Sequence, residues 1–217
     1  MSAANGTLPA VSFVDPRYTI LDDGTGNDDH PHADIRKGDL FLHRTFEAVA
    51  TGPQWASTVF IVNFDEWGGF FEHVAPPRAA AANNVDTDLV SGKALLGLRV
   101  PTVVASPFSR GNPNDARVSA LVFDHTSVLK LIEWRWGLAP LTPRDASSDV
   151  LSLAYALNFT DPDDSVPNLG EPQAPLIAAP CLANLGSGIL STGSTTGTPP
   201  EWQELRTQAA ALGFTVN

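Results

Sequence analysis

The segment 65–74, with the sequence Asp-Glu-Trp-Gly-Gly-Phe-Phe-Glu-His-Val, gathers side chains that can take part in chemistry. Asp65 and Glu66 are adjacent carboxylates that follow an apolar run, the position at which ligands collect in open α/β sheets. Carboxylates held close together repel unless a proton or a cation lies between them, so a hard divalent cation is a reasonable ligand. The paired glycines permit a sharp turn. The alternative is that both carboxylates only cap or solvate that turn.

A histidine and a serine elsewhere in the chain suggest a second kind of chemistry. His125 can transfer a proton, and the preceding Asp124 could orient its imidazole, bind a metal or start a helix. Ser106 follows a predicted strand, where an acyl-transfer nucleophile could stand with His125 as base and Asp124, Asp65 or Glu66 as acid. The chain lacks the G-x-S-x-G elbow at this serine. A carboxylesterase therefore stays open as an alternative.

Two apolar runs rich in β-branched residues are predicted to be strands that position these groups. They cover residues 58–64 and 100–105. Because these runs contain few polar residues, both strands are predicted to be buried on both faces. Between them, residues 76–97 are predicted to form a surface insertion.

Three helices are predicted around these strands. Asp39 is expected to cap a helix that ends at Gly52-Pro53, a second covers residues 126–137, and a third starts at Asp145 or Ser147 and runs through Leu157. Helices that alternate with buried strands predict an α/β fold with a mainly parallel sheet flanked by helices.

The composition limits the partners. With 13 Lys and Arg against 24 Asp and Glu, the net charge is −11, which disfavours nucleic acid and anionic membranes. The single cysteine, Cys181, excludes an intrachain disulfide and a cysteine-based zinc site.

No apolar stretch approaches the roughly 18 residues of a membrane span, so no integral membrane contact is expected. The first six residues do not resemble a signal peptide. A complete chain would therefore be cytoplasmic, and part of a longer precursor could be exported.

Several segments resemble the bacterial phosphoesterase family, which contains phospholipases C and acid phosphatases and is related to the alkaline-phosphatase-like superfamily. The matching segments follow the family's order and are residues 6–12, Asp29-His30-Pro31, Gly52-Pro53-Gln54-Trp55, 65–69, 73–77, 99–101, 106–108 and Asp124-His125-Thr126-Ser127. The resemblance implies an alkaline-phosphatase-like fold and metal-assisted hydrolysis of a small phosphate ester or a phospholipid headgroup. It implies that Asp65 and Glu66 bind a divalent metal cation and that His30 and His125 lie near the phosphoryl group.

One departure from the family pattern bears on activity. The family's upstream Glu-Asn-Arg-Ser-Phe-Asp-His-like segment and its later phosphorylated Ser or Thr have no counterpart here. Residues 1–160 therefore resemble the C-terminal part of the domain, without the N-terminal half, so a catalytically inactive fragment is a further alternative. Residues 161–217 are predicted to be an extended Pro- and Gly-rich wrap of the same domain, with a short helix over 201–212.

Two expectations follow for the surface. Strands 58–64 and 100–105 would lack neighbours in such a shortened chain, and open strand edges recruit other chains, so self-association is expected. Trp67, Trp134 and Trp136 are expected in the core or in a pocket wall rather than on a lipid-binding surface.

Overall fold

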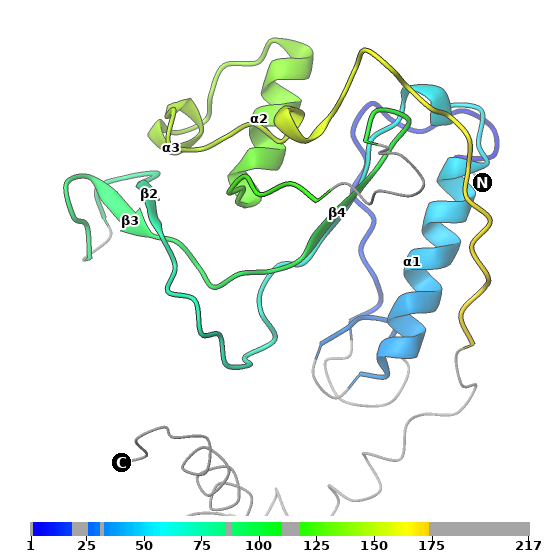
Figure 1. Ribbon diagram of the computed structural model, residues 1–217, viewed down its shortest axis with the longest axis horizontal. Coiled ribbons are helices and arrows are strands. Elements are labelled where there is room, and N and C mark those ends of the chain that lie inside the picture. The colour runs from blue at the N-terminus through cyan, green and yellow to red at the C-terminus, as the bar shows by residue number, and fades with distance from the viewer. Residues whose placement is uncertain (1, 19–25, 31–32, 86–87, 110–117, 174–217) are drawn as a thin grey trace, which may run out of the picture. The chain divides into compact units, whose positions relative to one another are not determined.

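A computed structural model describes residues 2–18, 26–30, 33–85, 88–109 and 118–173 (Figure 1). The chain divides into two units, Met1–Ala178 and Ala179–Asn217, and all described residues belong to the first. Residues 174–217, including the helix predicted over 201–212, lie outside the described residues. The elements in chain order are α1 (Ile35–Ala50), η1 (Trp55–Ser57), β1 (Phe60–Asn63), β2 (Arg78–Ala80), β3 (Lys93–Leu95), β4 (Thr102–Ala105), α2 (His125–Trp136), α3 (Pro143–Ala146) and η2 (Leu153–Ala156).

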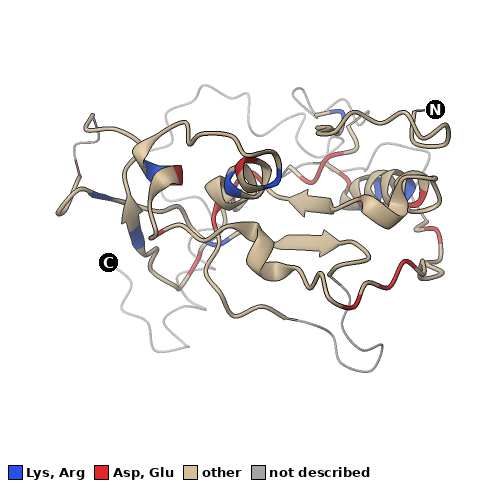
Figure 2. Cartoon of the chain, turned by 90° about the horizontal axis from the view of Figure 1, so that it is seen from above, with Lys and Arg blue, Asp and Glu red and all other residues tan. Residues whose placement is uncertain are grey.

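The two predicted strands exist and pair with each other as β1 and β4. Their register runs from Phe60 opposite Ala105 to Asn63 opposite Thr102, so the pair is antiparallel. The prediction of a mainly parallel sheet is therefore wrong for the described strands. A parallel pair needs a crossover, usually a helix, that returns the chain to its starting end, and the described part of the connection from β1 to β4 contains strands instead. Neither β1 nor β4 carries a charged residue (Figure 2).

Helical segments lie on both faces of β1, but the predicted burial of the strands on both faces is wrong, because β1 is only partly buried and Val103 of β4 is 57% exposed. Because side chains alternate along a strand, Phe60 faces α1, where its ring centroid lies 5.6 Å from that of Phe46. Ile61 faces the opposite way and packs against a core formed by Leu131 of α2 together with Leu153 and Leu157. The described sheet is therefore a thin layer between helical segments, although it is antiparallel.

Helix α1 begins earlier than the sequence indicates. The side chain of Asp34, not Asp39, caps it by accepting a hydrogen bond from the backbone N–H of Arg36. The helix ends at Ala50, and the backbone N–H of Gly52 donates to the carbonyl of Val49. The predicted end is therefore correct, and the error lies in choosing between two aspartates five residues apart.

The predicted surface insertion contains an antiparallel pair, β2 and β3, that packs onto the rest of the unit. Ala79 and Ala81 are buried, and Nζ of Lys93 lies 2.8 Å from a carboxylate oxygen of Asp149. Gly92 has a φ of 74°, which suits the turn that leads into β3. The segment lies at the surface as expected, since most of its described residues are exposed, and the two buried alanines anchor it to neighbouring elements.

Helix α2 confirms the prediction over 126–137, with Asp124 as N-cap and Gly137 in the left-handed C-cap conformation. Leu129, Trp134 and Trp136 are 39%, 58% and 43% exposed, so the two tryptophans of this helix do not lie in the core as expected. Among the described residues, no helix combines the length and the apolar character that crossing a membrane requires.

The third predicted helix is replaced by two short pieces, α3 and η2. Thr142 caps α3 with Pro143 at its first position, and Ser152 separately caps η2. Asp145 is therefore not a cap for a helix reaching Leu157. Burial raises the pKa of the Asp145 carboxyl, but hydrogen bonds from the Thr142 hydroxyl and the Leu141 amide outweigh it and hold that pKa well below its usual range.

Arg144 of α3 joins three elements. Its guanidinium forms an ion pair with Asp124 at 2.8 Å and donates to the Thr126 hydroxyl at 3.0 Å and to the Ala80 carbonyl at 3.3 Å. The Arg144 and Asp124 side chains are only 19% and 15% exposed, so water screens this ion pair poorly.

We predict that Arg144→Leu lowers the free energy of unfolding by about 2 to 3 kcal/mol, because it leaves the partly buried Asp124 carboxylate without its partner. Urea denaturation followed by far-UV circular dichroism measures this change. The control is Arg44→Leu, which breaks the pair of Arg44 with Glu171, whose side chains are 65% and 52% exposed, and which should cost less than about 1 kcal/mol. Equal effects of the two substitutions would contradict the role given to Arg144.

Candidate functional site

The acidic pair lies in an exposed turn directly after β1. Asp65 accepts a hydrogen bond from the backbone N–H of Glu66 at 3.1 Å, and Glu66 accepts one from that of Gly68 at 3.0 Å. Gly68 and Gly69 have φ values of 75° and 77°, a conformation that side chains with a Cβ rarely adopt. Both carboxylates therefore stabilise the turn, which is the alternative that the sequence left open, and both residues are exposed.

His125 lies beside this turn. Its Nε2 atom is 2.8 Å from the carbonyl oxygen of Phe64, the residue that precedes Asp65. A carbonyl can only accept, so Nε2 carries a proton and Nδ1 is the nitrogen that can exchange one. The structure thus brings together two of the predicted site segments, which are 61 residues apart in sequence.

Asp124 holds the start of α2 rather than the His125 imidazole. One carboxylate oxygen accepts the backbone N–H of Thr126 at 2.7 Å, and the other pairs with Arg144. Of the three roles that the sequence left open, the helix start is the one supported by these contacts. Asp124 therefore fixes the position of His125 through the helix backbone.

Ser106, the alternative nucleophile, is buried, with only 3% of its surface exposed. Its hydroxyl donates to the Thr58 carbonyl at 2.7 Å and accepts the backbone N–H of Phe108 at 3.3 Å. The first contact fastens the turn after β4 to the segment that leads into β1, and the second lies within the turn. In this arrangement the oxygen serves the backbone and does not face a substrate.

A third carboxylate of the same loop, Glu72, is clamped by an arginine. Arg99 donates from Nε and Nη2 to the two oxygens of Glu72, at 2.8 and 2.9 Å. These hydrogen bonds lower the pKa of Glu72 to about 2. Nδ1 of the exposed His73 lies 3.3 Å from the same carboxylate. The clamp therefore ties the end of the candidate loop to the segment that leads into β4.

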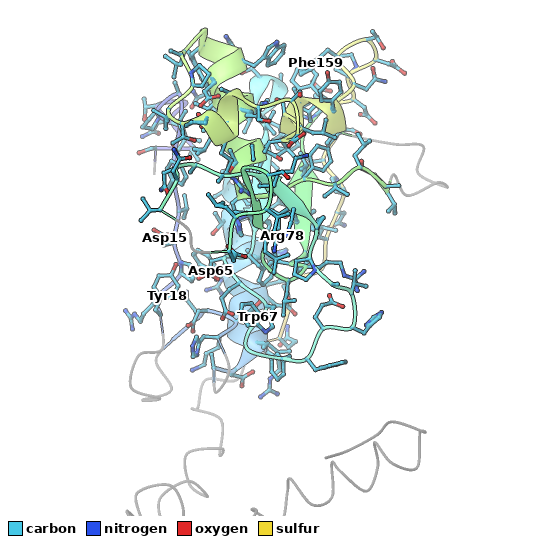
Figure 3. The ribbon with its side chains drawn as sticks, turned by 90° about the vertical axis from the view of Figure 1, so that its left-hand side faces the viewer. Asp15, Tyr18, Asp65, Trp67, Arg78 and Phe159 are labelled. Atoms are coloured by element: carbon cyan, nitrogen blue, oxygen red, sulfur yellow. The ribbon has the colours of Figure 1, made fainter. Side chains whose placement is uncertain are left out.

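The N-terminal segment also reaches this region, which the sequence did not reveal. Figure 3 shows Asp15 and Tyr18 on the same side of the molecule as Asp65 and Trp67. Partial burial and the negative charges of Asp15, Asp65 and Asp28 raise the pKa of the Tyr18 phenol. No spacing pattern relates residues so far apart in the chain, so only the folded structure could identify them.

His30 is exposed and lies in the turn before α1, where its carbonyl accepts the backbone N–H of Ala33 at 2.8 Å. The preceding residue, Asp29, approaches Gly38 so closely that a side chain there would collide with its carboxylate. Burial, and the neighbouring Asp39 and Asp28, raise the pKa of Asp29. The proximity of His30 to a phosphoryl group stays a prediction.

Asp65 and Glu66 have the donor type and charge that a divalent cation needs, but they do not make a complete site. Mg²⁺ and Ca²⁺ take six or more oxygen ligands. Within the described residues, no group of three or more His, Cys, Asp or Glu side chains is arranged to hold a metal ion. The described side chains can therefore supply only part of a cation's coordination.

Comparison with known proteins identifies relatives of the chain. The sequence profile of the Phosphoesterase family matches residues 1–139. Phospholipase C B of Mycobacterium tuberculosis is 33% identical over an alignment that covers 95% of this chain and 41% of that protein. Non-specific phospholipase C6 of Arabidopsis thaliana is 33% identical over 66% of this chain and 30% of its own length. Hemolytic phospholipase C of Pseudomonas aeruginosa is 36% identical over 61% of this chain and 18% of its own length. The chain thus spans less than half the length of these curated relatives.

We predict that the Glu72 carboxyl titrates near pH 2 and that Arg99→Gln raises its pKa toward the ordinary value of 4.5. Because the folded-state pKa is depressed, the clamp contributes fully above about pH 4.5 and is lost as the pH falls through 2. Carbon-13 NMR of the glutamate carboxyls measures both midpoints, and Arg78→Gln serves as the control. A wild-type midpoint near 4.5 would show that the clamp is absent in solution.

Proposed function

Because this chain belongs to the Phosphoesterase family, we propose that it acts in the hydrolysis of phosphate esters, with the turn after β1 and His125 as its contribution to the site. The observation that carries the proposal is the hydrogen bond between His125 and the Phe64 carbonyl, which joins two family segments at one place. An alkaline-phosphatase-like fold of the whole domain belongs to the same proposal.

The chemistry assigned to His125 is proton transfer. In hydrolysis a bond forms between the attacking oxygen and phosphorus while the bond to the alcohol oxygen breaks, and that leaving oxygen needs a proton. With Nε2 held by the Phe64 carbonyl, an imidazolium can release its Nδ1 proton to the alcohol oxygen. His30 is proposed to contact the phosphoryl oxygens. The attacking group is not assigned to a described residue, so an inactive fragment is the competing outcome.

A divalent cation bound by Asp65 and Glu66 is part of the proposal. The reason is electrostatic, because two carboxylates repel a phosphate unless a cation compensates their charge. The remaining ligands would come from outside the described residues.

The proposed substrate is a small phosphate ester or the headgroup ester of a phospholipid. The names of the relatives, all phospholipases C, favour the phospholipid. A carboxylesterase receives less support, because Ser106 would have to leave two backbone hydrogen bonds before its oxygen could attack an ester.

Residues 161–173 are proposed to start a wrap that belongs to the same domain as residues 1–160. Three contacts support this assignment. The Trp55 indole donates to the Asp164 carbonyl at 3.0 Å, Arg44 pairs with Glu171 at 2.9 Å, and the Asp163 amide donates to the Pro107 carbonyl at 2.9 Å.

The activity prediction uses the purified chain with bis-p-nitrophenyl phosphate, p-nitrophenyl phosphate and a short-chain p-nitrophenyl ester, each with and without a chelator. We expect chelator-sensitive phosphate release that falls about 100-fold or more in His125→Ala and in Asp65→Ala/Glu66→Ala. The matched control is His43→Ala, which removes a histidine from α1. Phosphatase activity that survives the acidic double substitution would refute the site. Chelator-resistant ester cleavage lost in Ser106→Ala would establish the esterase, and no activity on any substrate would establish the inactive fragment.

Self-association is also proposed, because β1 and β4 each pair along only one edge among the described strands. We expect a mass above 23.0 kDa by multi-angle light scattering at micromolar concentration. Val103→Lys, on β4 at a position 57% exposed, should reduce that mass by adding charge to the open strand. A monodisperse 23.0 kDa species with a cooperative melt would contradict the association.

A further inference from the structure

The turn between Glu66 and Glu72 exposes three aromatic side chains, and we name residues 67–71 the aromatic turn. Trp67, Phe70 and Phe71 are 42%, 68% and 89% exposed, and the two residues between Trp67 and Phe70 are glycines. The five residues carry no charge. The expectation that Trp67 lies in the core is therefore wrong.

The described fold offers the aromatic turn little cover of its own. The ring pairs found among described residues join Phe46 to Trp55 and Phe60, and Phe159 to Phe108 and Trp134. A Cβ placed on Gly69 would meet no atom within 4 Å, so the space beside the turn is open. The aromatic rings therefore face solvent, which is unfavourable unless a partner covers them.

The base of the aromatic turn is firmly held. Glu66 accepts the backbone N–H of Gly68, and Glu72 is clamped by Arg99 while it accepts the N–H of Val74 at 3.0 Å. Arg99 also neutralises the Glu72 charge. The tip is thus an uncharged projection on a fixed base.

The size and composition of the tip favour a lipid surface over a protein partner. Aromatic side chains bury about 150–250 Å² each, so at these exposures the three present roughly 400 Å². A stable protein interface needs about 800 Å² from each partner. Trp and Phe on a projecting loop are side chains that settle at the boundary between lipid headgroups and acyl chains.

We propose that the aromatic turn inserts its side chains into the interfacial region of a zwitterionic lipid surface. The net charge of −11 and the neighbouring Asp65 and Glu66 disfavour anionic lipid, which leaves neutral, zwitterionic headgroups as the matching surface. Two residues of extended chain span at most about 7 Å, so inserting Trp67 brings Asp65 to the depth of the headgroup phosphates. The inference rests on the proposed function in one respect, since it makes a lipid at that surface the source of the phosphate ester.

The test measures co-flotation of the full chain with phosphatidylcholine vesicles and with phosphatidylglycerol vesicles at low salt. We expect binding to phosphatidylcholine to exceed binding to phosphatidylglycerol and to fall at least tenfold in Phe70→Ser/Phe71→Ser. The matched control, Leu141→Ser/Tyr155→Ser, removes two side chains that are 76% and 67% exposed elsewhere and should bind as the wild type does. Brominated phosphatidylcholine should quench tryptophan fluorescence less in Trp67→Phe than in the wild type.

Three results would overturn the inference: no vesicle binding by the wild type, equal loss in the control variant, or preference for phosphatidylglycerol. Loss of self-association in Phe70→Ser/Phe71→Ser without any vesicle binding would identify the turn as a protein contact instead. Hydrolysis of soluble bis-p-nitrophenyl phosphate separates this inference from the proposed function. If the chain binds phosphatidylcholine through the turn but hydrolyses nothing, the lipid contact holds and the proposed function fails.

Discussion

The partly buried ion pair between Asp124 and Arg144 is the interaction on which the candidate site depends. It joins α3 to the first turn of α2, and a further hydrogen bond carries Arg144 to the carbonyl of Ala80 in β2. Because Asp124 caps α2, the same carboxylate also determines where His125 begins the helix. An ion pair shielded from water has few alternative geometries that satisfy both charges, so it can fix a helix terminus more firmly than an exposed pair can.

The end of β1 is the place where distant parts of the sequence converge. The Phe64 carbonyl accepts from His125, and Asn63 beside it accepts from the Thr102 hydroxyl of β4 at 3.0 Å. The Glu72–Arg99 clamp then returns the loop to the segment before β4. These contacts hold a flexible glycine-containing turn at both ends. A site that uses carboxylates and an imidazole together needs this, because their relative positions must stay fixed.

Much of the apolar surface of the described fold is exposed to solvent. Among the described residues, eight apolar side chains are buried, whereas 25 large ones are exposed. An excess of this kind marks surfaces that meet a partner. The edges of β1 and β4 that pair with no other described strand, and the aromatic turn, each point to a different way of covering part of that area.

The sequence alone determined the features that depend on local chemistry. The strand before Asp65, the glycines of its turn, and the extent of α2 all follow from side chains close together in the chain. Family motifs likewise indicated the phosphoesterase relationship. Only the tertiary structure decided what depends on contacts between distant residues: the antiparallel pairing of β1 with β4, and the burial of Ser106 and the exposure of Trp67. Strand direction and burial are set by what the rest of the chain places alongside a residue, and local sequence does not contain that information.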